Sequence, residues 1–236
     1  MTVDARLGFA YLGALVICLT GVSAQAAGQA PDTIAARVLA CASCHGAEGQ
    51  GTNDEYFPRL AGKPSGYLFN QLVAFRDGRR KYPPMNYLLE FLPDPFLKDI
   101  ADYFASQRPP LPAPSVPVVS NEILAKGHAL VTQGDLQRGI PPCQGCHGPS
   151  FTGMEPAIPG LLGLRAKYIS AQLGAWRYGT RTAAAPDCMQ IVAGHLTEDD
   201  VKAIAAWLSS LPAPADASPA PHGSLQMPLN CGSEPN

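Results

Sequence analysis

The pentapeptide Cys41-Ala42-Ser43-Cys44-His45 recurs in the second half of the chain as Cys143-Gln144-Gly145-Cys146-His147. Two cysteines separated by two residues, with histidine directly after the second, are the attachment signature of c-type haem. The spacing lets both thiols form thioether bonds with the vinyl groups of one porphyrin, while the histidine offers an imidazole nitrogen to the iron. We therefore expect two covalently bound haem c groups, with thioethers at Cys41, Cys44, Cys143 and Cys146 and with His45 and His147 as axial ligands of the two irons.

A zinc site built from the same four cysteines is the alternative, because Cys-x-x-Cys pairs are also typical of zinc knuckles. The two pairs are separated by about a hundred residues, whereas zinc knuckles are usually separated by about fifteen to twenty. Both copies also carry the histidine, and a glycine follows each of them, at Gly46 and Gly148. These features favour haem.

The composition limits the classes of protein that remain. The 236 residues are enough for one or two domains. The formal net charge of -2 and the pI near 6.2 show no basic excess, so we expect no nucleic-acid partner. The 24 prolines and 23 glycines exceed the average for a domain and favour loop-rich units with stiff connections.

Residues 1–26 have the pattern of a secretory signal peptide, with Arg6 before an apolar stretch at 7–22 and small residues at Ala24 and Ala26. The apolar stretch, about sixteen residues long, is short for a membrane span. Haem of this type is attached outside the cytoplasm in bacteria, so we expect an exported, periplasmic protein. An uncleaved anchor is the alternative, and peripheral membrane association stays open.

The two halves of the chain are related by an internal repeat. Cys44 and Cys146 are 102 residues apart, and Tyr67-x-x-x-Gln71-x-x-x-Phe75 recurs as Tyr168-x-x-x-Gln172-x-x-x-Trp176 at an offset of 101. Proline is dense over 109–119 and forces an extended connector. We expect a signal peptide at 1–26, a first unit at 27–108, a linker at 109–119, a second unit at 120–211 and a Pro-rich tail at 212–236.

Apolar periods and capping signals predict the helices of each unit. We expect Met85 to lie in a rigid extended loop after Pro83-Pro84, Met189 to follow an irregular stretch, and the tail to be poorly ordered except where Cys231 holds it. The expected helices span residues 32–40, 66–75, 94–107, 121–133 and 168–178, and a last helix begins at the N-cap Thr197.

The repeat also selects the second axial ligands. A six-coordinate electron-transfer haem often takes a methionine thioether opposite histidine. Met85 and Met189 fall at equivalent places, whereas Met154 and Met227 have no counterpart. We expect Met85 and Met189 to bind iron and Met154 to pack in a loop.

Other residues with metal-binding or redox chemistry have less specific patterns. Cys188 and Cys231 are expected to pair in an oxidising compartment, with free thiols or iron ligation by Cys188 as alternatives. The cations at 79–81 indicate either a solvated surface or contacts with an acidic partner or the haem propionates. Surface or packing roles are expected for the histidines without a counterpart, which are His128, His195 and His222.

With these residues, the chain resembles the dihaem cytochrome c family known as cytochrome c4 over about residues 30–210. Beyond the haem motifs, the resemblance rests on the segments Pro58-Arg59-Leu60-Ala61-Gly62, Gly139-Ile140-Pro141-Pro142 and 100–107. It implies an all-α fold of two tandem cytochrome c domains, each wrapped around one covalent haem and packed face to face. It also implies His/Met ligation, carried onto His45 with Met85 and onto His147 with Met189.

The function that follows is electron carriage without substrate chemistry, because six-coordinate iron leaves no open position. The resemblance implies a periplasmic shuttle between a respiratory donor, either a quinol-oxidising complex or a dehydrogenase, and a terminal oxidase or reductase. One alternative is the cytochrome subunit of a periplasmic dehydrogenase complex, such as a flavin-dependent sulfide dehydrogenase. A dihaem redox enzyme is a further alternative, against which the matched Met85 and Met189 argue.

Overall fold

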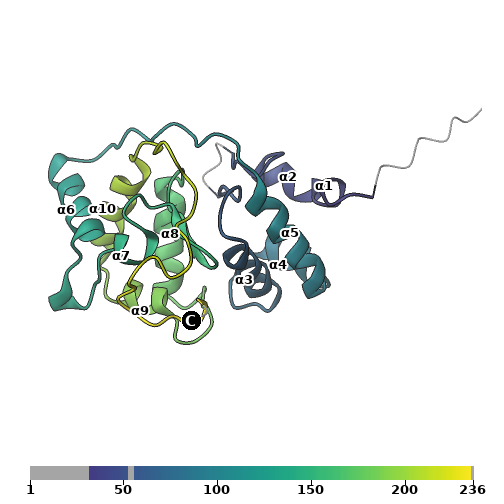
Figure 1. The fold of residues 1–236 in the computed structure, drawn as a ribbon. Helices are drawn as coiled ribbons and strands as arrows, with labels where there is room; N and C mark the ends of the chain where they lie inside the picture. Colours follow the sequence, from purple (N-terminus) through teal and green to yellow (C-terminus); the bar gives the residue numbers. More distant parts are fainter. Residues whose placement is uncertain (1–31, 53–55, 235–236) are drawn as a thin grey trace, which may run out of the picture. The chain divides into compact units, whose positions relative to one another are not determined.

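The computed structural model describes residues 32–52 and 56–234, which form helices joined by loops and one short hairpin (Figure 1). The predicted signal peptide at 1–26 lies outside the described residues. Within the described part of the chain, no helix is long and apolar enough to cross a membrane.

The first haem motif belongs to a group of five helices that ends at Ser106. The helix expected over 32–40 is broken near Val38, and the motif itself is helical. Asp94 and Pro95 begin the last helix of the group, as predicted, because proline at the first positions sacrifices no helical hydrogen bond. The helices are α1 (Ile34–Arg37), α2 (Leu39–His45), α3 (Ser65–Arg76), α4 (Pro83–Leu89) and α5 (Asp94–Ser106).

The second group repeats this plan and adds a hairpin. Thr197 caps the last helix through a reciprocal pair of hydrogen bonds with Asp200, as the sequence predicts. The elements are α6 (Asn121–Thr132), a 3-10 turn (Leu136–Arg138), α7 (Gln144–His147), β1 (Gly153–Met154), β2 (Ile158–Pro159), α8 (Ala166–Arg177), α9 (Cys188–Gly194) and α10 (Glu198–Ser209). The proline-rich stretch at 109–118 contains no helix or strand.

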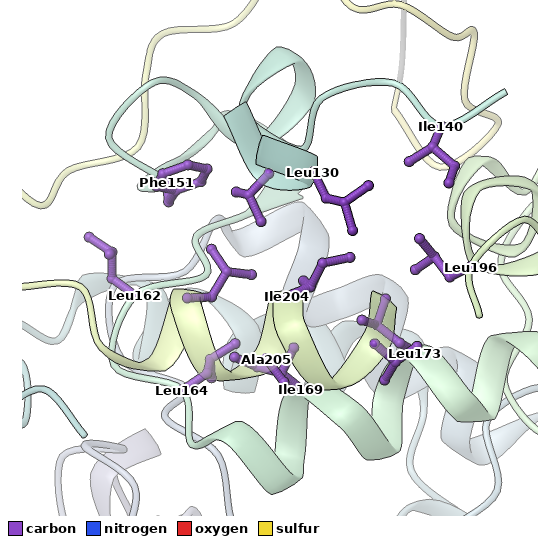
Figure 2. Packing of buried hydrophobic residues seen from close by; sticks show 13 residues of the cluster. Leu130, Ile140, Phe151, Leu162, Leu164, Ile169, Leu173, Leu196, Ile204 and Ala205 are labelled. Carbon is purple, nitrogen blue, oxygen red and sulfur yellow. The ribbon is translucent and has the colours of Figure 1, made fainter. Parts of the chain in front are cut away.

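Each group has its own hydrophobic core. In the first, α3 packs against α5, and the buried residues include Leu68, Leu97 and Phe104. In the second, α10 packs against both α6 and α8, and Figure 2 shows Ile204 and Ala205 of α10 facing Leu130 and Ile169. These two cores support the short helices α2 and α7 that carry the haem motifs.

All three methionines lie in regular elements, and for Met85 and Met154 this differs from the expectation of a loop. Met85 lies in helix α4, not in an extended loop, because Pro83 and Pro84 occupy the first positions of that helix, where a missing N–H costs nothing. Met189 is the second residue of α9, which Asp187 caps by accepting from the Gln190 N–H. Met154 is buried in strand β1, where it pairs with Ile158.

The C-terminal tail also differs from the prediction of poor order. Ala220 bridges strand β1, with its N–H donating to the Gly153 carbonyl and its carbonyl accepting from the Glu155 N–H, both at 2.9 Å. Further on, Cys231 forms a disulfide with Cys188. A segment that pairs its backbone and carries a cross-link needs no core of its own to be ordered.

Candidate functional site: two histidine-centred haem sites

The second haem motif lies in a tight turn of helix. Cys143 caps α7, and its carbonyl accepts from the His147 N–H at 2.9 Å, so Cys143, Cys146 and His147 belong to one helical turn. Gly148 then turns the chain with a φ of +83°, a conformation that side chains disfavour. Gly46 has a φ of +82° at the equivalent place after His45, so the repeated glycine has a backbone reason.

Both histidines are oriented by a proline carbonyl. The distance from Nδ1 to the carbonyl oxygen is 2.9 Å for His45 and Pro58, and 2.8 Å for His147 and Pro159. Because a carbonyl only accepts, Nδ1 carries the proton and Nε2 keeps the lone pair that a metal requires. Burial lowers the pKa of both imidazoles, which keeps them neutral.

One cavity in the second half brings four of the predicted site residues together. Ile204, Leu208 and Leu173 supply apolar walls to it. The predicted site residues in its lining are Cys143, Cys146, His147 and Met189. Burial raises the pKa of the Cys143 thiol to about 12, which reflects its enclosed and largely apolar surroundings in the cavity.

The polar groups of this cavity fit a haem. Trp176 Nε1 is buried and has no hydrogen-bond partner among the described residues, although buried indole N–H groups usually find one. The Arg181 guanidinium lies 3.7 Å from the centre of the Trp176 ring, and Lys63 lines the same cavity. A donor without an acceptor, beside two buried cations, suits the carboxylates of the haem propionates.

In the first half, the predicted site residues gather around the other core. Cys41 and Met85 pack against the cluster that contains Val38, Leu68 and Phe75. His45 is buried, and its ring meets Phe57 edge-on at 6.3 Å between ring centres. The described contacts thus bring Cys41 and Met85 to one apolar cluster.

A buried polar network joins the two halves, and the sequence analysis found it only in part. Arg80 donates to Tyr168 and Gln172 at 2.8 Å, and to Gln71 at 3.0 Å. Arg181 makes the reciprocal bonds, at 2.7 Å to Gln71, 2.8 Å to Gln172 and 3.3 Å to Tyr67. Arg80 is therefore not a solvated surface cation.

Arg181 was missed by the sequence analysis, although a signal for it exists. The repeat continues past Phe75 and Trp176 to Gly78 and Gly179, and one arginine follows each glycine by two residues. Both arginines are buried, at 8% and 4% exposure, and each guanidinium lies over the aromatic ring of its own half, Phe75 or Trp176. Extending the repeat by two positions would have found the pair.

The remaining candidates have structural roles. The Cys188–Cys231 disulfide confirms the predicted pairing and excludes the alternative in which Cys188 is an iron ligand as a thiolate. His128 packs against Trp207, with 5.3 Å between ring centres. The zinc alternative is wrong, because no three His, Cys, Asp or Glu side chains in the described ranges lie close enough to hold a metal ion.

Paired Cys-x-x-Cys-His motifs, each with its histidine oriented by a proline carbonyl, define a c-type cytochrome with two haem sites. The cytochrome c family model matches residues 33–103 and 124–212. The chain is 39% identical over 199 residues to cytochrome c4 of Pseudomonas aeruginosa, covering 84% of this chain and 95% of the relative. It is 36% identical over 183 residues to the "Thiosulfate dehydrogenase electron acceptor" of Thiomonas intermedia, covering 77% and 83%.

A solved structure agrees with these matches. Reduced recombinant cytochrome c4 from Pseudomonas stutzeri superposes with a TM-score of 0.65 at 33% identity, covering 75% of this chain and 96% of that one. The chain belongs to the cytochrome c family and, within it, is a dihaem cytochrome c4-like protein with two cytochrome c domains. It carries two covalently bound haem c groups and transfers electrons.

Proposed function

We propose that the protein is a periplasmic carrier of single electrons between redox proteins, without an enzymatic activity of its own. In this proposal the haems are attached through Cys41, Cys44, Cys143 and Cys146. The axial pairs are His45 with Met85 and His147 with Met189. The observation that carries the proposal is the shared cavity of Cys143, Cys146, His147 and Met189 in the second domain.

The protein's own residues set the properties of each site. Bound haem supplies a one-electron couple at the iron. Pro58 and Pro159 fix the imidazoles with their lone pairs at Nε2, and Leu173, Ile204 and Leu208 give the second cavity an apolar lining. A methionine in the sixth position closes the site to substrates and raises the potential.

The buried cations add an electrostatic contribution. Arg181 and Lys63 line the second cavity, and burial lowers the pKa of Lys63 to about 8. Positive charge near a haem disfavours the ferric state, which bears the higher charge. We infer that these side chains offset the propionate charge and help to keep the potential of the second haem high.

Two kinds of electron donor fit this carrier. One is a respiratory quinol-oxidising complex, with a terminal oxidase or reductase as the acceptor. The other is a periplasmic dehydrogenase, which is favoured by the relative named as an electron acceptor of thiosulfate dehydrogenase. The predicted export signal at 1–26 supports a periplasmic location in either case.

Stopped-flow reduction of the ferric, haem-loaded protein tests the proposal. Purified thiosulfate dehydrogenase with thiosulfate and a purified quinol-oxidising complex with quinol are compared as donors. We expect rapid reduction of both haems by at least one donor, at a rate that rises linearly with donor concentration. Failure of both donors and of both acceptors, a terminal oxidase and a reductase, would refute the carrier function. Turnover of thiosulfate by the protein alone would refute the absence of enzymatic activity.

A further inference from the structure

The C-terminal segment lies beyond the part of the chain that matches the cytochrome c family, which ends at residue 212. We call residues 224–233 the strap. It contains no helix or strand, with bends at 225 and 228–229 and a turn at 232–233, and its exposure alternates along the chain. The strap residues that turn toward the protein are half-buried, namely Leu225, Met227, Leu229, Cys231 and Ser233, whereas the residues between them are exposed. One side of the strap therefore faces the second domain.

The strap lies over the second haem motif, where the yellow trace in Figure 1 passes α7 and reaches α9. A Cβ atom on Gly145 would lie 3.5 Å from Pro228, and one on Gly148 would lie 3.8 Å from Leu225. Leu229, Cys231 and Ser233 line the same cavity as Cys143, Cys146 and His147. The strap thus forms part of the wall of the second haem site.

Three contacts anchor the strap. The Cys188–Cys231 disulfide ties it to α9, directly beside Met189. The Gly232 N–H donates to the Pro186 carbonyl at 3.0 Å. In the other direction, the Ser233 carbonyl accepts from the Asn70 side chain at 3.2 Å. These anchors hold the covering side chains in place over the motif.

The first haem motif is more open than the second. Gly46 is half-buried where its counterpart Gly148 is buried, and Ser43 is exposed where Gly145 is half-buried. Leu39, two residues before the first motif cysteine, is 68% exposed. The nearest described atoms to a Cβ atom on Gly46 belong to the Gln50 side chain, four residues along the chain, and not to the strap. The two motifs are thus equivalent in sequence and unequal in access.

We propose that the strap shields the second haem from protein redox partners, so that electrons enter and leave the protein through the motif surface of the first domain. This inference rests on the proposed carrier function. Electron tunnelling falls steeply with distance, and the strap adds a layer of chain between the second haem motif and a docked partner. The second haem then exchanges electrons with the first haem and not directly with partners.

Access is measured without any electron transfer. The haem-loaded protein is reduced with ascorbate, which leaves the disulfide intact, and a soluble gadolinium chelate is added. Broadening of the amide protons of Gly145 and Gly148 is compared with that of Ser43 and Gly46. We expect at least about tenfold weaker broadening at the second motif, because the strap keeps the chelate farther from these amides.

Two variants release the strap, and one serves as a control. Cys231→Ser removes the covalent anchor, and Leu225→Asp combined with Cys231→Ser also removes the contact with Gly148. Gln226→Ala changes an exposed strap residue and should leave the protection intact. We expect the double variant to broaden Gly145 and Gly148 as strongly as Ser43 and Gly46. Equal broadening of both motifs in the unaltered protein, or persistent protection in the double variant, would overturn the proposal.

Electron exchange then separates the shield from the carrier function. In mixtures of ferric and ferrous protein, exchange broadening of the NMR signals reports electron transfer between two molecules. We expect the unaltered protein to exchange electrons through its first motif only. The double variant, with both motifs open, should exchange faster. Exchange through the second haem at the same rate in both proteins would overturn the shield. If neither protein exchanges electrons with itself or with any donor, the carrier function fails, while the amide data still decide whether the strap covers the motif.

Discussion

Replacing Asp200 with asparagine tests the packing that supports the second haem site. Asp200 is 1% exposed in the first turn of α10. Its carboxylate accepts from Lys126 and Arg138 at 2.8 Å each, and from the Thr197 N–H at 2.9 Å. The same helix contributes Ile204 and Leu208 to the cavity wall. The carboxylate therefore ties α6 and the chain before the haem motif to α10.

The expected loss follows from these contacts. Lys126 and Arg138 are 44% and 39% exposed, so they regain water in the variant and each pair contributes at most about 1 kcal/mol. Weakening the charged bond to the capping N–H adds about 1 kcal/mol. We expect Asp200→Asn to lower the unfolding free energy of the second domain by about 2 to 3 kcal/mol. Urea unfolding followed by circular dichroism measures the change.

The stability difference between Asp200→Asn and the unaltered protein should depend on pH. Burial by itself would raise the pKa of Asp200, but the bonds from Arg138, Lys126 and Thr197 outweigh it and hold the pKa well below its usual value. A carboxyl with a depressed pKa contributes stability above its unfolded pKa of about 3.9, and this contribution is lost as the pH falls through the folded value. The difference between the two proteins should shrink below about pH 4.

The exposed neighbour Asp199 provides the control. Asp199→Asn makes the same change of charge in the same helical turn, where only the helix dipole is affected. An Asp200→Asn loss no larger than that of Asp199→Asn would refute the reasoning, as would a difference that persists unchanged in acid.

Three further predictions test the cross-link, the helix contact and the haem environment. Cys231→Ser removes the disulfide to Cys188, which closes a loop of 43 residues, and in the chain-entropy model this should destabilise the second domain by about 4 kcal/mol. Urea unfolding measures the loss, with Gln226→Ala as the control. Gly127→Ala should lower the unfolding free energy by about 1 to 3 kcal/mol, because its Cβ would lie 2.2 Å from a carbonyl oxygen of α10. Gly174 has open space around it, so Gly174→Ala should raise the unfolding free energy by about 0.5 to 1 kcal/mol. Thermal unfolding measures both variants, and equal effects would contradict the prediction. Trp176→Phe should lower the reduction potential of the second haem and spare the first, because it removes a donor to the propionates; an unchanged potential in a spectroelectrochemical titration would speak against that role for Trp176.

Because the two halves repeat each other, most of the fold could be predicted from the sequence. Helix α10 begins where its capping residue Thr197 predicts, whereas α5 begins at Asp94 itself, after Pro93 in the cap position and without a side-chain cap. Met85 shows the limit. Proline before a methionine is compatible with a loop or with the first turn of a helix, and the contacts of α4 with α3 decide in favour of the helix.

The site residues whose sequence spacing is fixed by haem chemistry were predictable. The residues that reach the site through long-range contacts were less so. The spacing of the Cys-x-x-Cys-His motif depends only on local backbone geometry, so the motif can be recognised from the sequence alone. The reciprocal bonds of Arg80 and Arg181 are long-range and are invisible in either half alone. Likewise, nothing in the composition of the tail distinguishes a free Pro-rich segment from the strap, whose position depends on Cys231 and on backbone pairing at Ala220.

The absorption of the ferric protein at the red end of the visible spectrum tests the central claim most directly. Methionine bound to ferric haem gives a weak band there, and Met85→Ala and Met189→Ala each remove one of the two proposed thioether ligands. We predict that each single variant loses about half of the band and that the double variant loses all of it. A band that keeps its full intensity in the double variant would contradict histidine–methionine ligation at both irons.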